Sequence, residues 1–278
     1  MAASPFTIQS FKSAKAKGEP ITMLTAYDYT TATLLDEAGV DSILVGDSLG
    51  MVMLGYENTL KVTMDDMIHH TRAVARGTRN GLLIGDMPFL SYHISVEETV
   101  RNAGRFVQEG GAQAVKLEGG QTVIDKIQAI VKAQIPVLGH LGLTPQSVNA
   151  MGGFKLQGKD IETARQILDD ALLLQDAGVF GIVLECVPSA LARIITEKLD
   201  IPTIGIGAGS QCDGQVLVIQ DLLGMFRQMR PKFVKTFAQG GDTVVSAVKQ
   251  YIDEVRAGTF PAKEHGFAID ENILEKLR

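Results

Sequence analysis

The chain has 278 residues, of which 45% are hydrophobic and 21% charged, and its formal net charge is −6. This length suits either two ordinary domains or one α/β barrel with a large core. The composition is that of a soluble globular protein, and no apolar run is long enough to cross a bilayer. Lysines and arginines are scattered along the chain, which argues against a nucleic-acid partner.

Neither the start of the chain nor its cysteines indicate an extracellular protein. The first twenty residues contain no basic segment followed by an apolar core, so we expect no secretory signal and a cytoplasmic location. Cys186 and Cys212 are the only cysteines, and they form no CxxC motif. This argues against a disulfide framework or a zinc site.

Short apolar runs alternate with longer segments of helical period, as expected where helices cover both faces of a parallel sheet. The eight predicted strands are residues 21–27, 42–46, 82–85, 114–117, 137–139, 181–184, 203–206 and 215–219. Eight such alternations in this length favour a (β/α)8 barrel over a doubly wound sheet. We predict one barrel domain over residues 1–278, with a short N-terminal extension and a C-terminal helical segment.

Several helix boundaries can be predicted from single residues. Thr63 with Asp66, and Ser95 with Glu98, each place a capping hydroxyl three residues before an acid, which predicts a helix start. Three glycines predict helix ends with a left-handed residue: Gly39, Gly110 and Gly178. The segment 143–161 is long and glycine-rich for a βα loop, so it is either a lid over the site or a surface excursion without a role.

Nearly every predicted strand ends in an ionisable or polar residue. In a barrel of this kind the carboxyl ends of the strands meet at one mouth, where the active site lies. The residues at or just after these ends are Tyr27 and Asp28, Asp47 and Ser48, Asp86, Lys116 and Glu118, His140, Glu185, the glycine-rich run 205–209, and Asp221. Any single one could instead cap the following helix, but their joint position predicts a shared site.

Three of these residues are acids that follow consecutive strands. Asp47, Asp86 and Glu118 would repel one another in a narrow mouth unless a cation held them. Carboxylates without paired histidines or cysteines are hard oxygen ligands, which favour Mg²⁺ over zinc. A 2-oxo acid could fill the remaining positions on the metal through its carboxylate and keto oxygens.

Three further residues suggest how a substrate is handled. Lys116 lies two positions before Glu118, hence on the same face of a strand, and would neutralise an anionic substrate or form a structural ion pair. Glu185 would act as a general base if apolar surroundings raised its pKa; the alternative is a helix cap before Pro188. His140 would contact substrate or cofactor, or serve only the structure.

Seven segments together resemble the ketopantoate hydroxymethyltransferase family. They are ITMLTAYDYT, ILVGDSLGMVMLGYENTLKVTMDDMIHHTRAV, LLIGDMPFLSY, AVKLEGG, VLGHLGLTPQSVNAMGGFKLQGK, IVLECVPSALA and IPTIGIGAGSQCDGQVLVIQDLLGM. The likeness covers almost the whole chain in order, and GHLGLTPQSVN is highly specific. One departure lies near the C-terminus, where EHGFA stands in place of EHSF, so we assign no role to His265.

This resemblance implies a fold and a reaction. The fold would be a (β/α)8 barrel of the phosphoenolpyruvate/pyruvate type, assembled as a homodecamer. The enzyme would pass a hydroxymethyl group from 5,10-methylenetetrahydrofolate to 3-methyl-2-oxobutanoate through a Mg²⁺-stabilised enolate, and the product would be 2-dehydropantoate, in pantothenate synthesis.

The resemblance also implies residue roles. Asp47, Asp86 and Glu118 would form the Mg²⁺ site, with Glu118 acting through water. Asp47 would also contact the substrate. The other implied substrate contacts are Ser48, Asp86 and Lys116. The implied proton acceptor is Glu185. A possible contact to substrate or folate is His140.

Two other functions compete with this one. The first is a metal-dependent lyase or mutase that acts on oxo acids on the same barrel without folate. The second is a barrel that binds an oxo acid as a sensor or scaffold without turning it over. A pure binder has no need of a base, so Glu185 argues against the second.

Overall fold

A computed structural model describes residues 5–153 and 155–277. The chain divides into two compact units. The first is Met1–Gln220 with Pro231–Val234, and the second is Asp221–Arg230 with Lys235–Arg278. The expected single-domain organisation stays a prediction.

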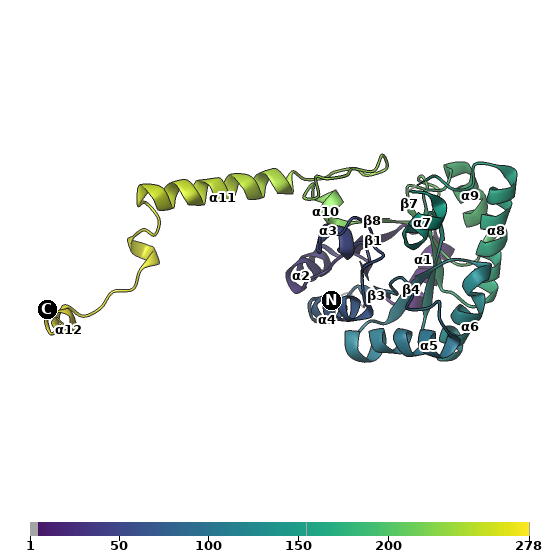
Figure 1. The fold of residues 1–278 in the computed structure, drawn as a ribbon, viewed down its shortest axis with the longest axis horizontal. Coiled ribbons are helices and arrows are strands. Elements are labelled where there is room, and N and C mark those ends of the chain that lie inside the picture. Colours follow the sequence, from purple (N-terminus) through teal and green to yellow (C-terminus); the bar gives the residue numbers. More distant parts are fainter. Residues whose placement is uncertain (1–4, 154, 278) are drawn as a thin grey trace. The chain divides into compact units, whose positions relative to one another are not determined.

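Within the described residues of the first unit, eight parallel strands form a closed barrel (Figure 1). Each strand pairs with its neighbours in chain order, and β8 pairs with β1 to close the sheet. The strands are β1 (Ile21–Thr25), β2 (Ser42–Val45), β3 (Leu82–Asp86), β4 (Ala114–Glu118), β5 (Val137–Gly142), β6 (Gly181–Glu185), β7 (Thr203–Ile206) and β8 (Gly214–Leu217). All eight predicted strands and the barrel are confirmed.

Three strand ends differ by two or more residues from those predicted. β8 ends at Leu217 rather than at residue 219, where α10 (Ile219–Leu222) begins. β1 ends at Thr25 rather than at residue 27, so Tyr27 lies in the loop that follows. β5 continues to Gly142, three residues beyond its predicted end. The glycines of GHLG suggested an early end, but pairing to β6 persists as far as Gly142, and the amide of Leu143 still donates to the carbonyl of Glu185 at 2.8 Å.

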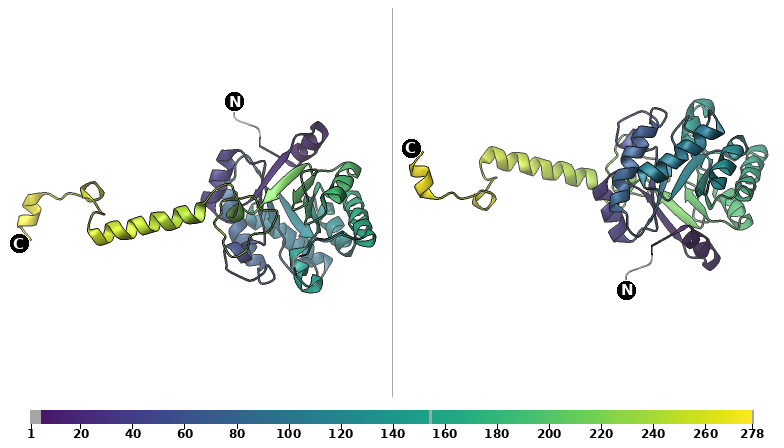
Figure 2. Two further views of the ribbon diagram at one scale, coloured as in Figure 1. Left: turned by 90° about the horizontal axis from the view of Figure 1, so that it is seen from above. Right: turned by 90° about the horizontal axis from the view of Figure 1, so that it is seen from below.

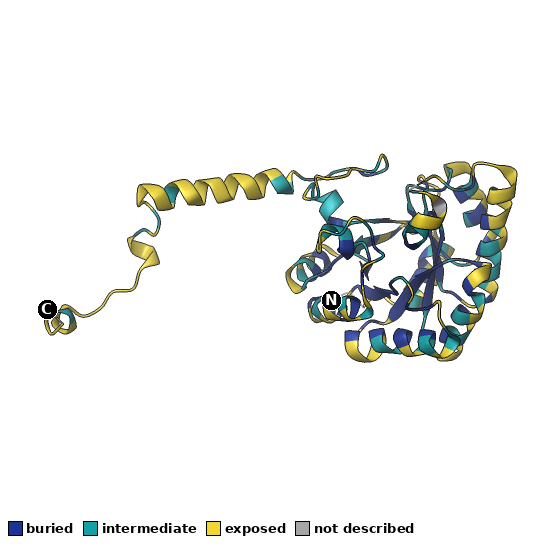
Figure 3. Cartoon of the chain, in the orientation of Figure 1, coloured by how far each residue is buried: buried dark blue, intermediate teal, exposed yellow. Residues whose placement is uncertain are grey.

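Helices surround the strands of this unit, and Figure 2 shows the same arrangement in two further views. The α-helices are α1 (Ile8–Lys17), α2 (Tyr29–Ala38), α3 (Leu49–Val52), α4 (Met64–Gly77), α5 (Val96–Arg105), α6 (Ile124–Lys132), α7 (Val148–Met151), α8 (Ile161–Asp176) and α9 (Ser189–Lys198). Shorter turns are η1 (Phe106–Gly110), η2 (Gln121–Val123) and η3 (Pro145–Ser147). The strands are buried and the outer helix faces exposed, which explains the unbroken apolar strand patterns (Figure 3).

The predicted caps form at the helix starts. Thr63 and Asp66 make a reciprocal capping box at α4, and the Ser95 side chain accepts from the amide of Glu98 at α5. Gly39 and Gly178 have the positive φ that a helix end needs.

The prediction for Gly110 is wrong by one residue. The left-handed residue is Gly111, with φ of 78°, because η1 adds a wider turn to the end of α5. Gly110 is instead buried against Thr71, where an added Cβ would lie 2.9 Å from the Thr71 Cγ2 atom.

An apolar plug closes the amino ends of the strands. The Phe11 ring of α1 is fully buried and lies 5.5 Å from the Phe6 ring and 5.1 Å from the Phe180 ring, centroid to centroid. It belongs to the core cluster that includes the first residues of β1 and β3, Ile21 and Leu82. The N-terminal extension therefore completes the barrel core.

The second unit consists mainly of helices: α11 (Gly240–Ala257), η4 (Lys263–His265), α12 (Glu271–Glu275) and the end of α10 (Ile219–Leu222). Its longest helix, α11, has no buried residue in this structure. Large apolar side chains recur along it at Val244, Val248, Tyr251 and Val255, and all four are exposed. Across the described residues, none of the helices combines the length and apolar character needed to span a membrane.

Candidate active site

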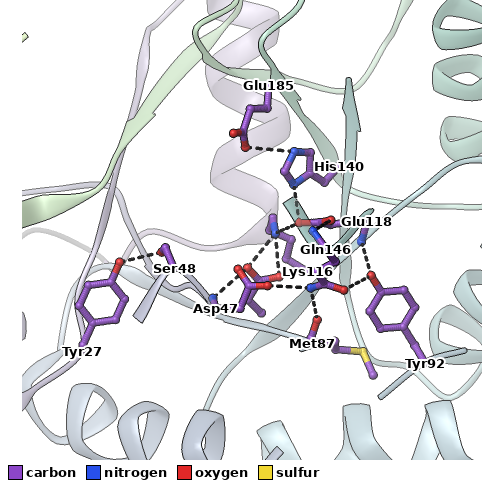
Figure 4. Close-up of polar contacts among 11 residues, drawn as sticks. Tyr27, Asp47, Ser48, Met87, Tyr92, Lys116, Glu118, His140, Gln146 and Glu185 are labelled. Atoms are coloured by element: carbon purple, nitrogen blue, oxygen red, sulfur yellow. Dashed lines mark hydrogen bonds and ion pairs between the residues drawn. The ribbon is translucent and has the colours of Figure 1, made fainter. Parts of the chain in front are cut away.

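Four charged side chains are buried together where β2, β3 and β4 end (Figure 4). Asp86 and Glu118 are the last residues of β3 and β4, and Asp47 lies two residues after β2. The sheet register pairs Asp86 with Lys116, and the lysine Nζ lies 2.7 and 2.8 Å from the two Asp86 carboxylate oxygens. The same nitrogen lies 3.9 Å from Glu118 Oε1, as expected for two residues on one face of β4.

The cluster holds more negative than positive charge in a dry environment. Burial, together with the neighbouring charge of Asp86, raises the pKa of Asp47 to about 7. Burial also raises the pKa of Glu118 well above its usual value, although the charge of Lys116 opposes this. Burial alone would lower the pKa of Lys116, but Asp86, Glu118 and Asp47 raise it above its usual value, so the lysine remains protonated.

The donor set of this cluster fits a hard divalent cation. It offers carboxylate oxygens, and Glu118 Oε1 is buried without a hydrogen-bond partner among the described residues. In this arrangement Asp86 faces Lys116, and no group of three His, Cys, Asp or Glu side chains in residues 5–153 and 155–277 is set to hold a metal. The Asp47, Asp86 and Glu118 ligand set stays a prediction.

Ser48 lies beside the cluster and contacts an aromatic hydroxyl. Its Oγ is 2.8 Å from the hydroxyl of Tyr27, which is buried in the loop after β1. Ser48 precedes the short helix α3 but its side chain makes no capping bond there. His70 of α4 contacts the Tyr27 carbonyl through Nδ1 at 2.6 Å, so α4 supports this loop.

His140 connects the acidic cluster to Glu185. Its Nδ1 lies 3.7 Å from Glu118 Oε1, and its Nε2 lies 3.4 Å from Glu185 Oε2. Burial and the positive charge of Lys116 lower the pKa of His140, which favours the neutral ring. Glu185 ends β6 and its side chain is 16% exposed, so it lies at the opening of the site rather than deep within it.

The structure thus brings together all seven residues selected from the sequence: Asp47, Ser48, Asp86, Lys116, Glu118, His140 and Glu185. Two other acids selected at strand ends, Asp28 and Asp221, are not among these seven. Asp28 caps α2 by accepting from the amide of Thr31, and Asp221 lies within α10, in the second compact unit. For Asp28 the capping alternative is therefore the one observed.

Sequence reasoning missed two buried residues of the site, Gln146 and Tyr92. The Gln146 side-chain amide donates to Asp47 Oδ2 at 2.9 Å and to the Met87 carbonyl at 2.9 Å. The Tyr92 hydroxyl donates to Gln146 Oε1 at 2.6 Å. Both residues are in loops, beyond the strand ends that were searched, and the available signal was the specific segment GHLGLTPQSVN.

The loop 143–161 begins inside the site. It forms η3 and α7 directly after β5, and its residue 154 lies outside the described part of the chain. Gly142 makes the entry possible, since its φ is +95° and an added Cβ would collide with the Glu185 carbonyl. A lid function for the rest of the loop stays a prediction.

Several solved structures share this fold. Phosphonopyruvate hydrolase aligns with a TM-score of 0.60 and 15% identity, over 96% of this chain and 93% of that one. A 2,3-dimethylmalate lyase, described as a member of the PEP mutase/isocitrate lyase superfamily, aligns with a TM-score of 0.58 and 13% identity, over 97% and 90%. These likenesses agree with the closed eight-stranded barrel, so the predicted (β/α)8 fold is confirmed.

Sequence comparison then identifies the family. Residues 5–263 match the family model of ketopantoate hydroxymethyltransferase. The 3-methyl-2-oxobutanoate hydroxymethyltransferase of Clostridium novyi (strain NT) is 64% identical over 271 residues, 98% of each chain, and that of Acetivibrio thermocellus is 62% identical over 98% of this chain and 96% of its own. The chain belongs to the ketopantoate hydroxymethyltransferase family, and the prediction that it is a transferase is confirmed.

Proposed function

We propose that this chain transfers a hydroxymethyl group from 5,10-methylenetetrahydrofolate to 3-methyl-2-oxobutanoate and releases 2-dehydropantoate. The observation that carries the proposal is the placement of Glu185 across His140 from a buried cluster of three carboxylates and one lysine. The names of the relatives, 3-methyl-2-oxobutanoate hydroxymethyltransferase, support the choice of substrate over the lyase and sensor alternatives.

Each residue has a role that follows from its position. Asp47, Asp86 and Glu118 would hold Mg²⁺, which when bound would polarise the keto oxygen of the substrate. Lys116 stays protonated and would balance negative charge on the bound oxo acid. Ser48, whose Oγ is already oriented by Tyr27, would donate to the substrate carboxylate.

Glu185 would remove the proton from C3 of the oxo acid. It is accessible from the mouth, unlike the three cluster carboxylates, which are nearly fully buried. His140 Nε2 lies 3.4 Å from the Glu185 carboxylate, so it would orient the base and is the residue we propose as a further contact to substrate or folate. Water would hydrolyse the methylene bridge of the folate, breaking both of its C–N bonds to release tetrahydrofolate and leaving the carbon as formaldehyde. The deprotonated C3 would then form a C–C bond to this carbon, and the formaldehyde oxygen would take up a proton to become the hydroxyl of 2-dehydropantoate.

We further propose that the protein acts in the cytoplasm as a homodecamer. The exposed apolar residues of α11, defined above, support self-association, because soluble chains rarely leave such a series uncovered.

Proton NMR in D₂O tests the reaction. The enzyme is mixed with 3-methyl-2-oxobutanoate and Mg²⁺, first without and then with methylenetetrahydrofolate. We expect metal-dependent loss of the C3 proton signal in the first sample, and hydroxymethyl product only in the second. If folded protein gives neither exchange nor product, the substrate is wrong and the lyase and sensor alternatives are favoured. Exchange without product would leave the base in place and contradict the transfer.

A further inference from the structure

The segment LTPQS follows β5 and contains a residue that contacts two of the three acids of the cluster. Gln146 is 4% exposed and lies in η3, which begins with Pro145. Its side-chain nitrogen donates to Asp47 Oδ2 at 2.9 Å, and its backbone amide donates to Glu118 Oε2 at 3.1 Å. Asp47 and Glu118 are thus held from one residue by two separate donors.

The orientation of the Gln146 side chain is determined by its other contacts. The second hydrogen of its amide nitrogen bonds the Met87 carbonyl at 2.9 Å, and its oxygen accepts from the Tyr92 hydroxyl at 2.6 Å. Tyr92 is itself buried and accepts from the Glu118 amide at 3.3 Å. A flipped amide would point oxygen at the Asp47 carboxylate and at a carbonyl, so only one orientation satisfies all these groups.

These hydrogen bonds stabilise negative charge on the buried carboxylates of Asp47 and Glu118. Asp47 and Glu118 are nearly fully buried, and Lys116 makes its short contacts with Asp86, at 2.7 and 2.8 Å. A neutral donor to each of the two remaining carboxylates stabilises negative charge without adding a positive charge that would compete with a cation. One oxygen of Glu118, Oε1, remains without a hydrogen-bond partner among the described side chains, although its other oxygen is held.

We propose that Gln146 is a positioning residue of the active site, which holds Asp47 and Glu118 in place for a divalent cation, and that Tyr92 fixes the orientation of its amide. The proposal rests on the metal site of the proposed function. Partners that orient metal ligands typically contribute about 10- to 100-fold to metal affinity. Gln146 therefore acts through the carboxylates and need not touch the substrate.

The test is a titration of the protein with Mn²⁺ in the absence of substrate and folate, with binding measured by electron paramagnetic resonance. The variants are Gln146→Leu, which removes the side-chain donor, Gln146→Glu, which also adds charge, and Tyr92→Phe, which removes only the hydroxyl. Asn149→Asp is the control for Gln146→Glu, because Asn149 is exposed on α7 three residues further along. Tyr29→Phe is the control for Tyr92→Phe, because Tyr29 is 52% exposed.

We expect Gln146→Leu to weaken Mn²⁺ binding about 10- to 100-fold and Tyr92→Phe by a smaller factor, with both controls within twofold of the parent protein. Saturating metal should restore much of the turnover of Tyr92→Phe, which a general loss of structure would not allow. If the parent protein binds Mn²⁺ and both Gln146→Leu and Tyr92→Phe bind it equally well, the positioning role is wrong. If the parent protein does not bind Mn²⁺, the metal site fails and this proposal fails with it.

Should Gln146→Leu not fold, the comparison of Tyr92→Phe with Tyr29→Phe decides the question alone. Metal binding that is unchanged in Tyr92→Phe then overturns the proposal. Failure of the hydroxymethyl transfer with normal Mn²⁺ binding would count against the proposed reaction and not against the role of Gln146.

Discussion

The two ends of the barrel differ in chemical character: one is apolar and the other is charged. At the amino ends of the strands, Phe6, Phe11 and Phe180 pack edge to face, and the nearby charge of Lys15 is paired with Asp213 at 2.9 Å. At the carboxyl ends, three carboxylates and a lysine are buried together, and polar atoms of Glu118 and His140 lack hydrogen-bond partners among the described residues. The first end is satisfied internally, whereas the second has binding capacity left for a ligand.

From this contrast we expect the apolar amino ends to contribute mainly to stability and the charged carboxyl ends mainly to activity. Burial of apolar rings stabilises a fold without any partner. Burial of like charges costs free energy unless something compensates it, so it persists where function requires it. Substitutions at the two ends should therefore separate activity from stability, and the following variants test that separation in order of decreasing effect.

The largest effect is expected for Glu185→Gln. Loss of the base should lower turnover about 10²- to 10⁴-fold, while binding of 3-methyl-2-oxobutanoate and the melting temperature stay close to those of the parent protein. Steady-state kinetics, calorimetric binding and thermal unfolding measure the three quantities. Glu197→Gln, on the exposed face of α9, is the control. A loss of binding as large as the loss of turnover would contradict the assignment of the base.

Asp86→Ala should damage both activity and stability. It removes the short-range partner of Lys116 and leaves that charge buried, which costs about 3 to 5 kcal/mol. Urea unfolding measures the loss, and calorimetry should show weaker substrate binding as well. Normal substrate affinity in a folded Asp86→Ala protein would remove Asp86 from the substrate and metal site.

Phe11→Ala should affect the other end alone. Deleting a fully buried ring costs about 3 to 5 kcal/mol in the free energy of unfolding, but the acidic cluster lies at the opposite ends of the strands. Below its melting temperature the variant should keep the turnover and the Mn²⁺ affinity of the parent protein. Phe267→Ala is the control, because Phe267 is fully exposed. A large fall in Mn²⁺ affinity in folded Phe11→Ala would show that the two ends are coupled.

The smallest effect is expected for the pH dependence of stability that Asp36 contributes. Its carboxylate accepts hydrogen bonds from backbone amides just before β3. Burial acts to raise the pKa of Asp36, but bonds from the amides of Gly81, Asn80 and Arg79 outweigh it and lower the pKa. A depressed folded-state pKa contributes stability above the unfolded-state pKa of about 3.9, and this stability is lost as the pH falls through the lower folded-state value.

Asp36→Asn should therefore cost about 1 kcal/mol at pH 7, and the difference from the parent protein should shrink below about pH 4. Urea unfolding across that range measures it. Asp41→Asn is unsuitable as a control, since Asp41 also accepts from the Thr22 amide, so Glu37→Gln on the exposed face of α2 serves. A difference that stays constant down to pH 3 would exclude the linkage.

The sequence allowed most of the fold to be predicted because its signals are local. Apolar runs gave the eight strands, and Thr63 and Ser95 marked helix starts through bonds to residues three positions away. The one misplaced helix end, at Gly110, depended on a wider turn that no short pattern announces.

The proximity of seven candidate residues could also be predicted from the sequence, because a parallel barrel carries every strand end to the same mouth. Gln146 and Tyr92 could not. Gln146 lies 99 residues from Asp47 and 54 from Tyr92 along the chain, and the three meet only after the loops that follow β2, β3 and β5 have converged.

By itself, therefore, the amino-acid sequence determined the alternation of strands and helices, the caps, and the order in which charged residues reach the mouth. These depend on spacing along the chain, which the covalent structure sets. Only the tertiary structure decided that Phe11 plugs the amino ends and that one glutamine holds two carboxylates, because such contacts depend on sheet register, barrel closure and the path of loops. They arise between residues that spacing alone does not relate.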